Sequence, residues 1–290
     1  MGEVLTVMNM KGGVGKTTVA IHIAGIFAKR SIAVAGRPLK VLAIDYDPQF
    51  NMSQAFLPAA RYFKIENEKK TILSVLIEDD SKLNPFKLQV PTSETPPSVG
   101  EVATAIIKGV NGYLDLVPST LDLMYVALGR FQRNMAPIEE RFEKFIAEAR
   151  SKYDLVVIDC HPAGSLFTQT ALSNSGYVLI PVAPQRYALR GVGLMLRFIA
   201  AKSVSTSNSP KPLILFNAVG RSGVSDEEVR VRGSREAKGF CLNNTLKRYK
   251  AFSEPEDGKG FVWESGRPYS KEARINLIQV AQEIAGRIGI

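Results

Sequence analysis

The sequence is poor in cysteine and histidine, and it contains no long apolar run. Its 290 residues include two cysteines, two histidines and one tryptophan. Cys160 and Cys241 are too few for a disulfide framework or a thiolate metal site, so the chain suits a reducing cytosol. The opening residues, MGEVLTVMNMKGG, carry no basic segment followed by an apolar stretch. We therefore expect neither a secretory signal nor a membrane-spanning helix.

The composition is that of a globular protein with a basic surplus. Hydrophobic residues make up 45% and charged residues 22% of the chain, which excludes a wholly disordered protein. Lysine and arginine number 37 against 28 acidic residues, for a net charge of +9. This surplus favours contact with a polyanion, although a basic surface without such a partner would give the same count.

Short apolar runs alternate with amphipathic segments along the chain. Because strands that alternate with helices form parallel sheets, the pattern predicts an α/β fold with a doubly wound, mostly parallel sheet flanked by helices. We expect one domain over residues 1–290, with an irregular elaboration at about 62–105. The predicted helices are Thr17–Lys29, Pro137–Arg150 and about 188–201. The predicted strands are Val4–Met8, Val41–Ile44, Leu114–Val117, Leu155–Ile158, Tyr177–Val182 and Leu213–Phe216.

A glycine-rich loop joins the first predicted strand to the first predicted helix. Residues 11–18 read KGGVGKTT. Glycines allow successive backbone N–H groups to turn inward as an anion nest, and the helix N-terminus adds its dipole. In this interpretation Lys16 reaches the β- and γ-phosphates, Thr17 offers its hydroxyl to Mg²⁺, and Thr18 lies near the α-phosphate. The alternative is a glycine turn before a helix that binds nothing.

The loop departs from the ordinary Walker pattern at its start. Met10 stands where the first glycine is usual, and Lys11 precedes Gly12. Here the sequence resembles the deviant Walker A ATPases, which include the ParA/Soj partition proteins, MinD and the nitrogenase iron protein. The resemblance implies ATP and Mg²⁺ as cofactors, with Lys11 reaching the partner's phosphates across a nucleotide-sandwich dimer. It makes Gly12, Gly13, Val14 and Gly15, together with residues 16–18, the nucleotide-binding loop. The alternative for Lys11 is a solvated loop lysine.

Three aspartates follow predicted strands. Asp45 and Asp47 stand in the run DYDPQ, and Asp159 follows the apolar strand Leu155–Ile158. Side chains at the carboxyl ends of strands line the ligand crevice of an open sheet. By the resemblance Asp47 positions the attacking water, Asp45 supports the metal shell, and Asp159 binds Mg²⁺ through a water. Turn and N-cap roles remain the alternatives.

Two further residues near these strands depart from or match the family pattern. His161 stands where ParA-type proteins commonly have a proline, and a structural hydrogen bond is favoured over an acid–base role. Asn217 ends the strand Leu213–Phe216 and matches the asparagine that reads the adenine edge in this family. A simple turn residue is the alternative for Asn217.

Basic residues concentrate between Arg221 and Lys250. This stretch holds eight lysines and arginines against four acidic residues, a local surplus of +4. In ParA relatives, late basic residues contact nonspecific DNA through its phosphates, which requires no base-reading module. No helix-turn-helix segment precedes the glycine loop, so we do not expect operator binding. A merely solvated basic face is the alternative. The candidate DNA-binding residues are Arg221, Arg230, Arg232, Arg235 and Lys238.

The leading hypothesis is a ParA-type ATPase of the cytoplasm, associated with the nucleoid. ATP would promote a homodimer that binds nonspecific DNA, and a ParB-like partner or other adaptor would stimulate hydrolysis and so drive plasmid or chromosome partition. Positioning of another cargo is an alternative. A MinD-like membrane ATPase would need a lipid-binding helix at Ala273–Ile290, but this segment has few aromatics and fits better as a helix packed on the sheet. An iron–sulfur reductase would need cluster cysteines that Cys160 and Cys241 do not supply.

Overall fold

The chain folds around a seven-stranded sheet with the strand order β3–β4–β2–β5–β1–β6–β7. The computed structural model describes residues 1–78, 83–84, 91, 93–128, 135–161, 166–205, 209–256, 258 and 260–290. Among these residues, neighbouring strands are parallel except for β3, which pairs antiparallel with β4. The strands are β1 (Glu3–Val7), β2 (Leu39–Tyr46), β3 (Thr104–Gly109), β4 (Gly112–Val117), β5 (Leu155–Cys160), β6 (Tyr177–Val182) and β7 (Lys211–Phe216).

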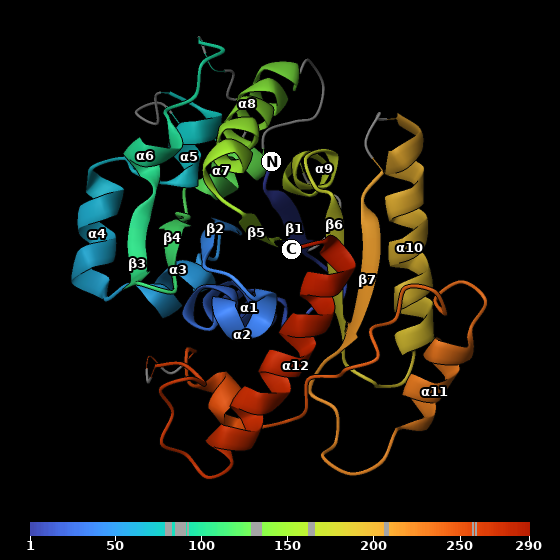
Figure 1. Ribbon diagram of the computed structural model, residues 1–290. Coiled ribbons are helices and arrows are strands. Elements are labelled where there is room, and N and C mark those ends of the chain that lie inside the picture. Colours follow the sequence, from blue (N-terminus) through green and yellow to red (C-terminus); the bar gives the residue numbers. More distant parts are fainter. Residues whose placement is uncertain are drawn as a thin grey trace.

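Helices cover both faces of the sheet (Figure 1). This confirms the expected doubly wound α/β architecture. One face carries α5 (Ile72–Leu76), α8 (Ala136–Lys152), α9 (Leu166–Ser173) and α10 (Ala188–Ser205). The other carries α1 (Lys16–Lys29), α2 (Ser31–Ala35), α3 (Asn51–Phe56) and α12 (Ser270–Ile288). The remaining elements are α4 (Ala59–Asn67), α6 (Val99–Val102), α7 (Leu123–Leu128), α11 (Asp226–Gly233) and η1 (Lys250–Ser253).

The central strands β2 and β5 are almost entirely buried because both of their sides are covered. Every residue of β5 is buried, as expected for a parallel strand between two helical layers. Strand β2 continues beyond the predicted end at Ile44 to Tyr46. Its last two residues, Asp45 and Tyr46, are buried and have hydrogen-bond partners inside the fold. The Tyr46 hydroxyl lies 2.9 Å from the Thr170 hydroxyl, and its ring stacks on Phe142 with 4.7 Å between centroids. Burying these polar groups is tolerated because each has a partner.

The stretch at 62–105 contains more regular structure than its sequence suggests. It includes most of α4, all of α5 and α6, and the start of β3, while residues 79–82, 85–90 and 92 lie outside the described part. The guanidinium of Arg141 in α8 is almost fully buried and donates hydrogen bonds to the backbone oxygens of Ser93 and Thr95, each at 2.8 Å. This side chain therefore fastens the segment before α6 to the helical layer.

The antiparallel edge strand β3 was not anticipated. A two-residue connection joins it to β4, with Gly109 opposite Gly112. Asn111-Gly112 at this connection is a strong hairpin signal in the sequence. Gly112 has φ 152°, and a Cβ there would come within 2.8 Å of the Leu39 backbone oxygen, so the position requires glycine.

Helix α12 packs against α1 and α2 rather than directly on the strands. Its buried face includes Leu277 and Val280, which are fully buried, whereas Ile275 is 47% exposed. The layer beneath it is α1, whose residues 19–28 are all buried. Within the described residues, no helix is both long and apolar enough to cross a bilayer.

Gly25 provides a test of this packing. A Cβ at Gly25 would lie 1.9 Å from Cη2 of Trp263, which has no room to move because it is buried. We expect Gly25→Ala to lower the free energy of unfolding by about 1–3 kcal/mol, the usual cost of overpacking. The matched control is Gly286→Ala on the exposed side of α12, where nothing lies within 4 Å. It should be neutral or stabilising by up to about 1 kcal/mol. Urea denaturation of both variants measures the contrast, and equal stabilities would contradict it.

Candidate functional site

The candidate site lies where β1, β2 and β5 end. Strand β1 sits between β5 and β6, so the chain leaves it at the point where the sheet order reverses. Ligands of open α/β sheets bind at such a switch point, outside the carboxyl ends of the strands. The glycine loop follows β1 directly and leads into α1, as the sequence predicts.

The loop has the backbone geometry of an anion nest. Gly13 and Gly15 adopt the left-handed conformation, with φ of 71° and 80°. Gly15 is also the N-cap of α1, so the first N–H groups of the helix face the loop. A Cβ at Gly15 would lie 2.5 Å from Nδ2 of Asn217, which itself donates to the Val14 backbone oxygen at 2.9 Å. Asn217 thus supports the loop from the end of β7.

The two lysines of the loop lie in different surroundings. Nζ of Lys16 is 3.5 Å from the backbone oxygen of Lys11, so it curls over the loop. Lys11 is exposed, and its Nζ donates to Oε1 of Gln185 at 3.3 Å. The structure therefore brings Lys16 into the nest and leaves Lys11 on the surface beside it.

Asp159 is the carboxylate that interacts with Thr17 and Lys16 at the end of the glycine loop. Its side chain is 1% exposed, and burial raises the pKa of the Asp159 carboxyl well above its ordinary value, as does the nearby Asp45. A hydrogen bond with Thr17 and the charge of Lys16 lower that pKa in part. Oδ2 of Asp159 has no hydrogen-bond partner among the described residues. A buried, unpartnered carboxylate oxygen beside a threonine hydroxyl is suited to a cation.

Asp45 is hydrogen-bonded to the beginning of α3. It is opposite Asp159 in the register of β2 and β5. Its Oδ2 accepts from both the N–H and the hydroxyl of Ser53, each at 2.7 Å, which anchors the start of α3. Burial raises the pKa of the Asp45 carboxyl to about 7 despite these bonds. Support of a metal shell by Asp45 stays a prediction.

Asp47 lies just beyond β2 and is 8% exposed. Its Oδ1 accepts from the backbone N–H of Gln49 at 2.9 Å, which holds the turn into α3. The positioning of an attacking water by Asp47 stays a prediction.

The residues of the site would hold the implied Mg²⁺ only together with a bound nucleotide. Within the described part of the chain, no group of three or more His, Cys, Asp or Glu is arranged to hold a metal ion. Thr17 and Asp159 offer hard oxygen donors, which Mg²⁺ prefers, but they are too few for its six ligands. Phosphate oxygens and water would have to complete the shell.

Two cavities flank the loop. One of about 820 Å³ extends from Gly12, Lys16 and Thr17 to Gln49 and Asn51. The other, of about 430 Å³, is lined by the loop glycines, by Asn217 and by residues 247–249 and 252–253. Together they can take phosphates on one side and a base on the other. The lining from residues 247–256 was not anticipated, because nothing in its sequence marks it as part of the site.

Comparison with known proteins agrees with this geometry. Residues 2–210, more than half of the chain, match the family described as an AAA domain. The sporulation initiation inhibitor protein Soj of Bacillus subtilis is 26% identical over 295 residues, which cover 98% of this chain and 99% of Soj. The chain belongs to the ParA/Soj family of ATPases.

Solved structures share the fold at lower identity. A plasmid partition protein of Borrelia burgdorferi, bound to AMPPNP, is 22% identical with a TM-score of 0.65, covering 97% of this chain and 98% of that one. The ParA of pNOB8, bound to nonspecific DNA, is 20% identical with a TM-score of 0.61 and covers 100% of this chain and 99% of that one.

His161 stands where ParA-type proteins commonly have a proline, and its backbone N–H joins two strands. The His161 N–H donates to the Tyr46 backbone oxygen at 3.3 Å, which ties β5 to β2 beyond their ends. Pro162 and Ala163 lie outside the described residues. Burial raises the pKa of the neighbouring Cys160 thiol, which keeps it protonated and makes it a packed residue rather than a nucleophile.

The five candidate DNA-binding residues separate into three groups. Arg221 is exposed and lies over the Tyr269 ring, 4.5 Å from its centroid. Arg230, Arg235 and Lys238 are exposed on and after α11. Arg232 turns inward: it donates to Glu228 at 2.8 Å and to the Leu242 backbone oxygen at 2.7 Å. Arg232 therefore serves the packing of α11, which corrects its expected place on the DNA-facing surface.

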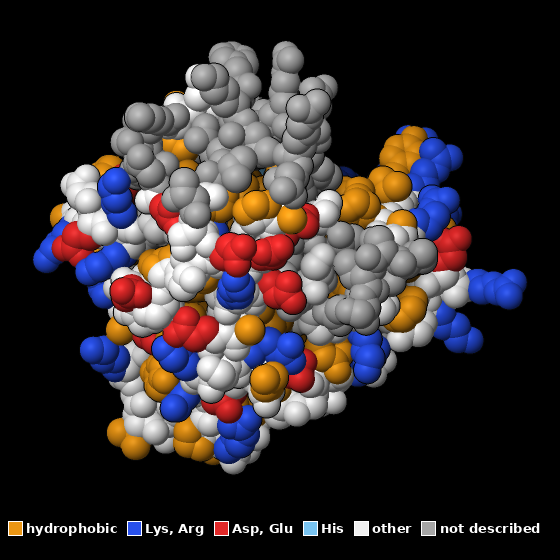
Figure 2. Space-filling model, turned by 90° about the horizontal axis from the view of Figure 1, so that it is seen from above, with side chains coloured by type: hydrophobic (Ala, Val, Ile, Leu, Met, Phe, Trp, Pro, Cys, Tyr) orange, Lys and Arg blue, Asp and Glu red, His pale blue; other side chains and the backbone are white. Residues whose placement is uncertain are grey.

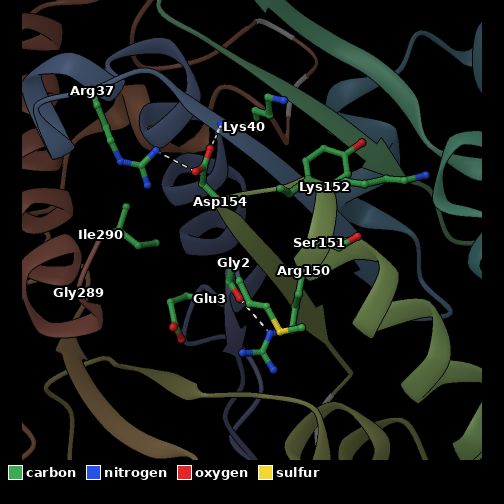
Figure 3. Close-up of a pocket in the computed structure, with 12 residues that line it drawn as sticks. Gly2, Glu3, Arg37, Lys40, Arg150, Ser151, Lys152, Asp154, Gly289 and Ile290 are labelled. Carbon is green, nitrogen blue, oxygen red and sulfur yellow. Dashed lines mark hydrogen bonds and ion pairs between the residues drawn. The ribbon is translucent and has the colours of Figure 1, made fainter.

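A further cavity of about 420 Å³ opens at the opposite edge of the sheet, by the amino ends of β1, β2 and β5. Figure 3 shows its cations engaged within the protein, with Arg37 directed to Asp154 and Arg150 to the Gly2 backbone. The Arg37–Asp154 pair measures 2.8 Å, and the Lys40 N–H also donates to Asp154. These contacts fix the amino ends of the central strands, far from the glycine loop.

His22 links the loop helix to the C-terminal part of the site. Its Nδ1 lies 2.7 Å from the backbone oxygen of Thr18, so Nδ1 carries the proton. Its ring makes edge contacts with Phe252 and Trp263, 5.1 and 6.0 Å between centroids. Burial lowers the pKa of His22 to about 4, although Glu254 nearby raises it in part. Nε2 has no hydrogen-bond partner among the described residues.

This depressed pKa predicts a pH dependence of stability. Between pH 6.5 and about 4 the unfolded chain binds a proton at His22 that the folded chain does not. On acidification through this window, the contribution of His22 to the free energy of unfolding should therefore fall by about 3 kcal/mol. Above pH 6.5 this contribution should be fully present. His22→Phe keeps an aromatic ring and should remove this contribution. Urea titrations of both proteins across the window give the difference curve, and a flat difference would contradict the assignment.

Proposed function

We propose that this protein is an ATP-dependent dimerising ATPase that binds nonspecific DNA and drives plasmid or chromosome partition. ATP with Mg²⁺ occupies the two cavities beside the glycine loop, and a ParB-like or other adaptor protein stimulates hydrolysis. The protein then acts in the cytoplasm, in association with the nucleoid. The relatives named as partition proteins and the nonspecific-DNA complex of pNOB8 ParA support this proposal.

One observation carries the proposal: the same segment lines the candidate nucleotide cavity and carries cations. Lys247, Arg248 and Tyr249 border the cavity that contains Asn217. The Arg248 N–H donates to the Val219 backbone oxygen at 2.8 Å, and Arg221 lies 6.0 Å from the Tyr249 ring centroid. A nucleotide and a DNA phosphate would thus bind on two sides of one strip of backbone.

The position of Lys11 supports assembly around the nucleotide. An exposed lysine at the rim of the nest adds little to its own site, where Lys16 already curls over the loop. Lys11 is held by Gln185 on the surface, and in the proposed dimer it would reach phosphates of the facing subunit. Such a cation stabilises the charge of phosphoryl transfer only after two loaded subunits meet.

The surface charge supports contact with DNA backbone. Seen from above, Lys and Arg side chains project at the right-hand edge, the side on which α10 lies, whereas the middle of the same face gathers acidic side chains (Figure 2). Helix α11 supplies Arg230, and Arg235 and Lys238 follow it, all exposed. Exposed cations without a base-reading module bind phosphates irrespective of sequence.

A membrane-bound function is not favoured. The apolar residues of α12 that a lipid surface would need are buried against α1 and α2. Only Ile275 among its large apolar side chains is more than a third exposed.

The roles of Lys11 and Asp47 can be separated by substitution. Asp47→Ala should retain ATP binding and ATP-dependent dimers but lose at least about 100-fold in hydrolysis rate, because the attacking water is no longer positioned. Lys11→Ala should lose both stimulated hydrolysis and dimers, because its charge acts across the interface. Lys144→Ala, a surface lysine of α8, is the control. Light scattering with ATP and phosphate release measure the two properties. Monomers in ATP for both variants would contradict the division of roles.

Nonspecific DNA binding should be ATP-dependent and steeply sensitive to salt. Each phosphate contact contributes about −0.9 to the slope of log K against log salt. A variant with alanine at Arg221, Arg230, Arg235 and Lys238 should bind all sequences more weakly and with a flatter slope. The control replaces four exposed lysines elsewhere, Lys64, Lys108, Lys144 and Lys152, and so removes the same charge. Fluorescence anisotropy at several salt concentrations compares them. Equal losses in both variants would show that only net charge matters.

A further inference from the structure

An acidic side chain from the C-terminal part of the chain reaches the first turn of α1. Oε1 of Glu256 accepts a hydrogen bond from Oγ1 of Thr18 at 2.6 Å, across 238 positions of sequence. Both residues border both of the cavities that flank the glycine loop. Glu256 is exposed, so its negative charge faces the space into which a nucleotide would bind.

A carboxylate at this place resembles a phosphate in its chemistry. Thr18 follows Lys16 and Thr17 at the N-terminus of α1, where N–H groups and the helix dipole favour an anion. The Thr18 hydroxyl has a single proton, so it can donate to Glu256 or to a phosphate oxygen, but not to both. Two anions side by side also repel each other.

The segment that carries Glu256 is packed as one piece with α1. Glu254 is 5% exposed and accepts from Nε of Arg267 at 2.7 Å. Phe252 meets His22, which donates to the backbone oxygen of Thr18, the same residue that Glu256 holds by its side chain. These contacts connect Thr18 and α1 to the backbone segment that also carries Arg248 and Lys250.

We propose that Glu256 competes with the nucleotide phosphates for Thr18, and so sets the nucleotide affinity of the site. Binding of ATP displaces Glu256, and the displacement shifts the segment from Arg248 to Glu256 with its cations. The inference rests on the proposed ATP- and DNA-binding function. It makes Glu256 an affinity-determining residue rather than a catalytic one, and it links phosphate binding to the surface assigned to DNA.

The test compares the full-length protein with Glu256→Ala and with the control Glu264→Ala. Glu264 is an exposed carboxylate of the same C-terminal region, so the control removes equal charge without touching Thr18. Calorimetric titration with ATP should show binding at least about fivefold tighter for Glu256→Ala than for the wild type or the control. Titration with adenosine, which has no phosphate, should show no change in affinity.

A second readout follows DNA binding at increasing ATP concentration. By linkage, the ATP concentration that gives half-maximal DNA binding should fall by the same factor in Glu256→Ala. Unchanged ATP affinity in Glu256→Ala, or an equal gain for adenosine and ATP, would overturn competition for Thr18. An unshifted DNA midpoint despite tighter ATP binding would overturn the link to the cations. Absence of ATP binding in the wild type would overturn the proposed function together with this inference.

Discussion

Two carboxylates, Asp45 and Asp159, are buried side by side at the carboxyl ends of β2 and β5. Burial deprives both of water and raises both pKa values, that of Asp45 to about 7, and the nearby charge of Asp45 raises the pKa of Asp159 further. The surrounding elements reduce this cost. Helix α3 begins where Ser53 can give two hydrogen bonds to Asp45, and α1 begins where Thr17 and Lys16 reach Asp159. The geometry of the site follows from the need to satisfy these two groups.

The same site also presents an anion nest. Gly13 and Gly15 turn backbone N–H groups inward just before Lys16 and Thr17, which interact with Asp159. A free anion would be repelled by the carboxylates, and a free cation would be repelled by the inward-facing N–H groups of the nest. Neither ion alone therefore satisfies the whole site. A metal-bound polyphosphate carries both charges in the required order, with anionic oxygens for the nest and a cation for the unpartnered oxygen of Asp159. This combination of an anion nest and an unpartnered carboxylate oxygen would favour a metal–nucleotide complex over either ion alone, as the proposed function requires.

The features that the sequence predicts are those set by neighbouring residues. Strand β1, the loop and α1 are contiguous, so their order and the place of Lys16 and Thr17 follow from a short stretch of sequence. The role of Asp45 could not be predicted in this way, because it depends on Ser53 turning back after the strand. The part of the cavity lining formed by residues 247–256 is still harder to predict from the sequence, since these residues approach Thr18 only in the folded chain. Asn111-Gly112, by contrast, was a local signal from which β3 could have been found.

The basic stretch shows where counting charges fails and helical geometry succeeds. Arg230 and Arg232 are two positions apart in α11, and residues at that spacing do not share a helix face. Glu228 is buried and lies four positions before Arg232, so their pair faces the core, where Arg232 also covers the Phe216 ring at 4.8 Å. Arg230 pairs with Glu227 on the outer side and keeps most of its surface in water. Because Arg232 is held by a buried carboxylate and a backbone oxygen, it would contribute little to phosphate binding in the proposed DNA complex. The number of phosphates contacted in that complex would then be set by the outward face of α11 and the strip beside Arg221, and it would be smaller than the count of lysines and arginines between residues 221 and 250.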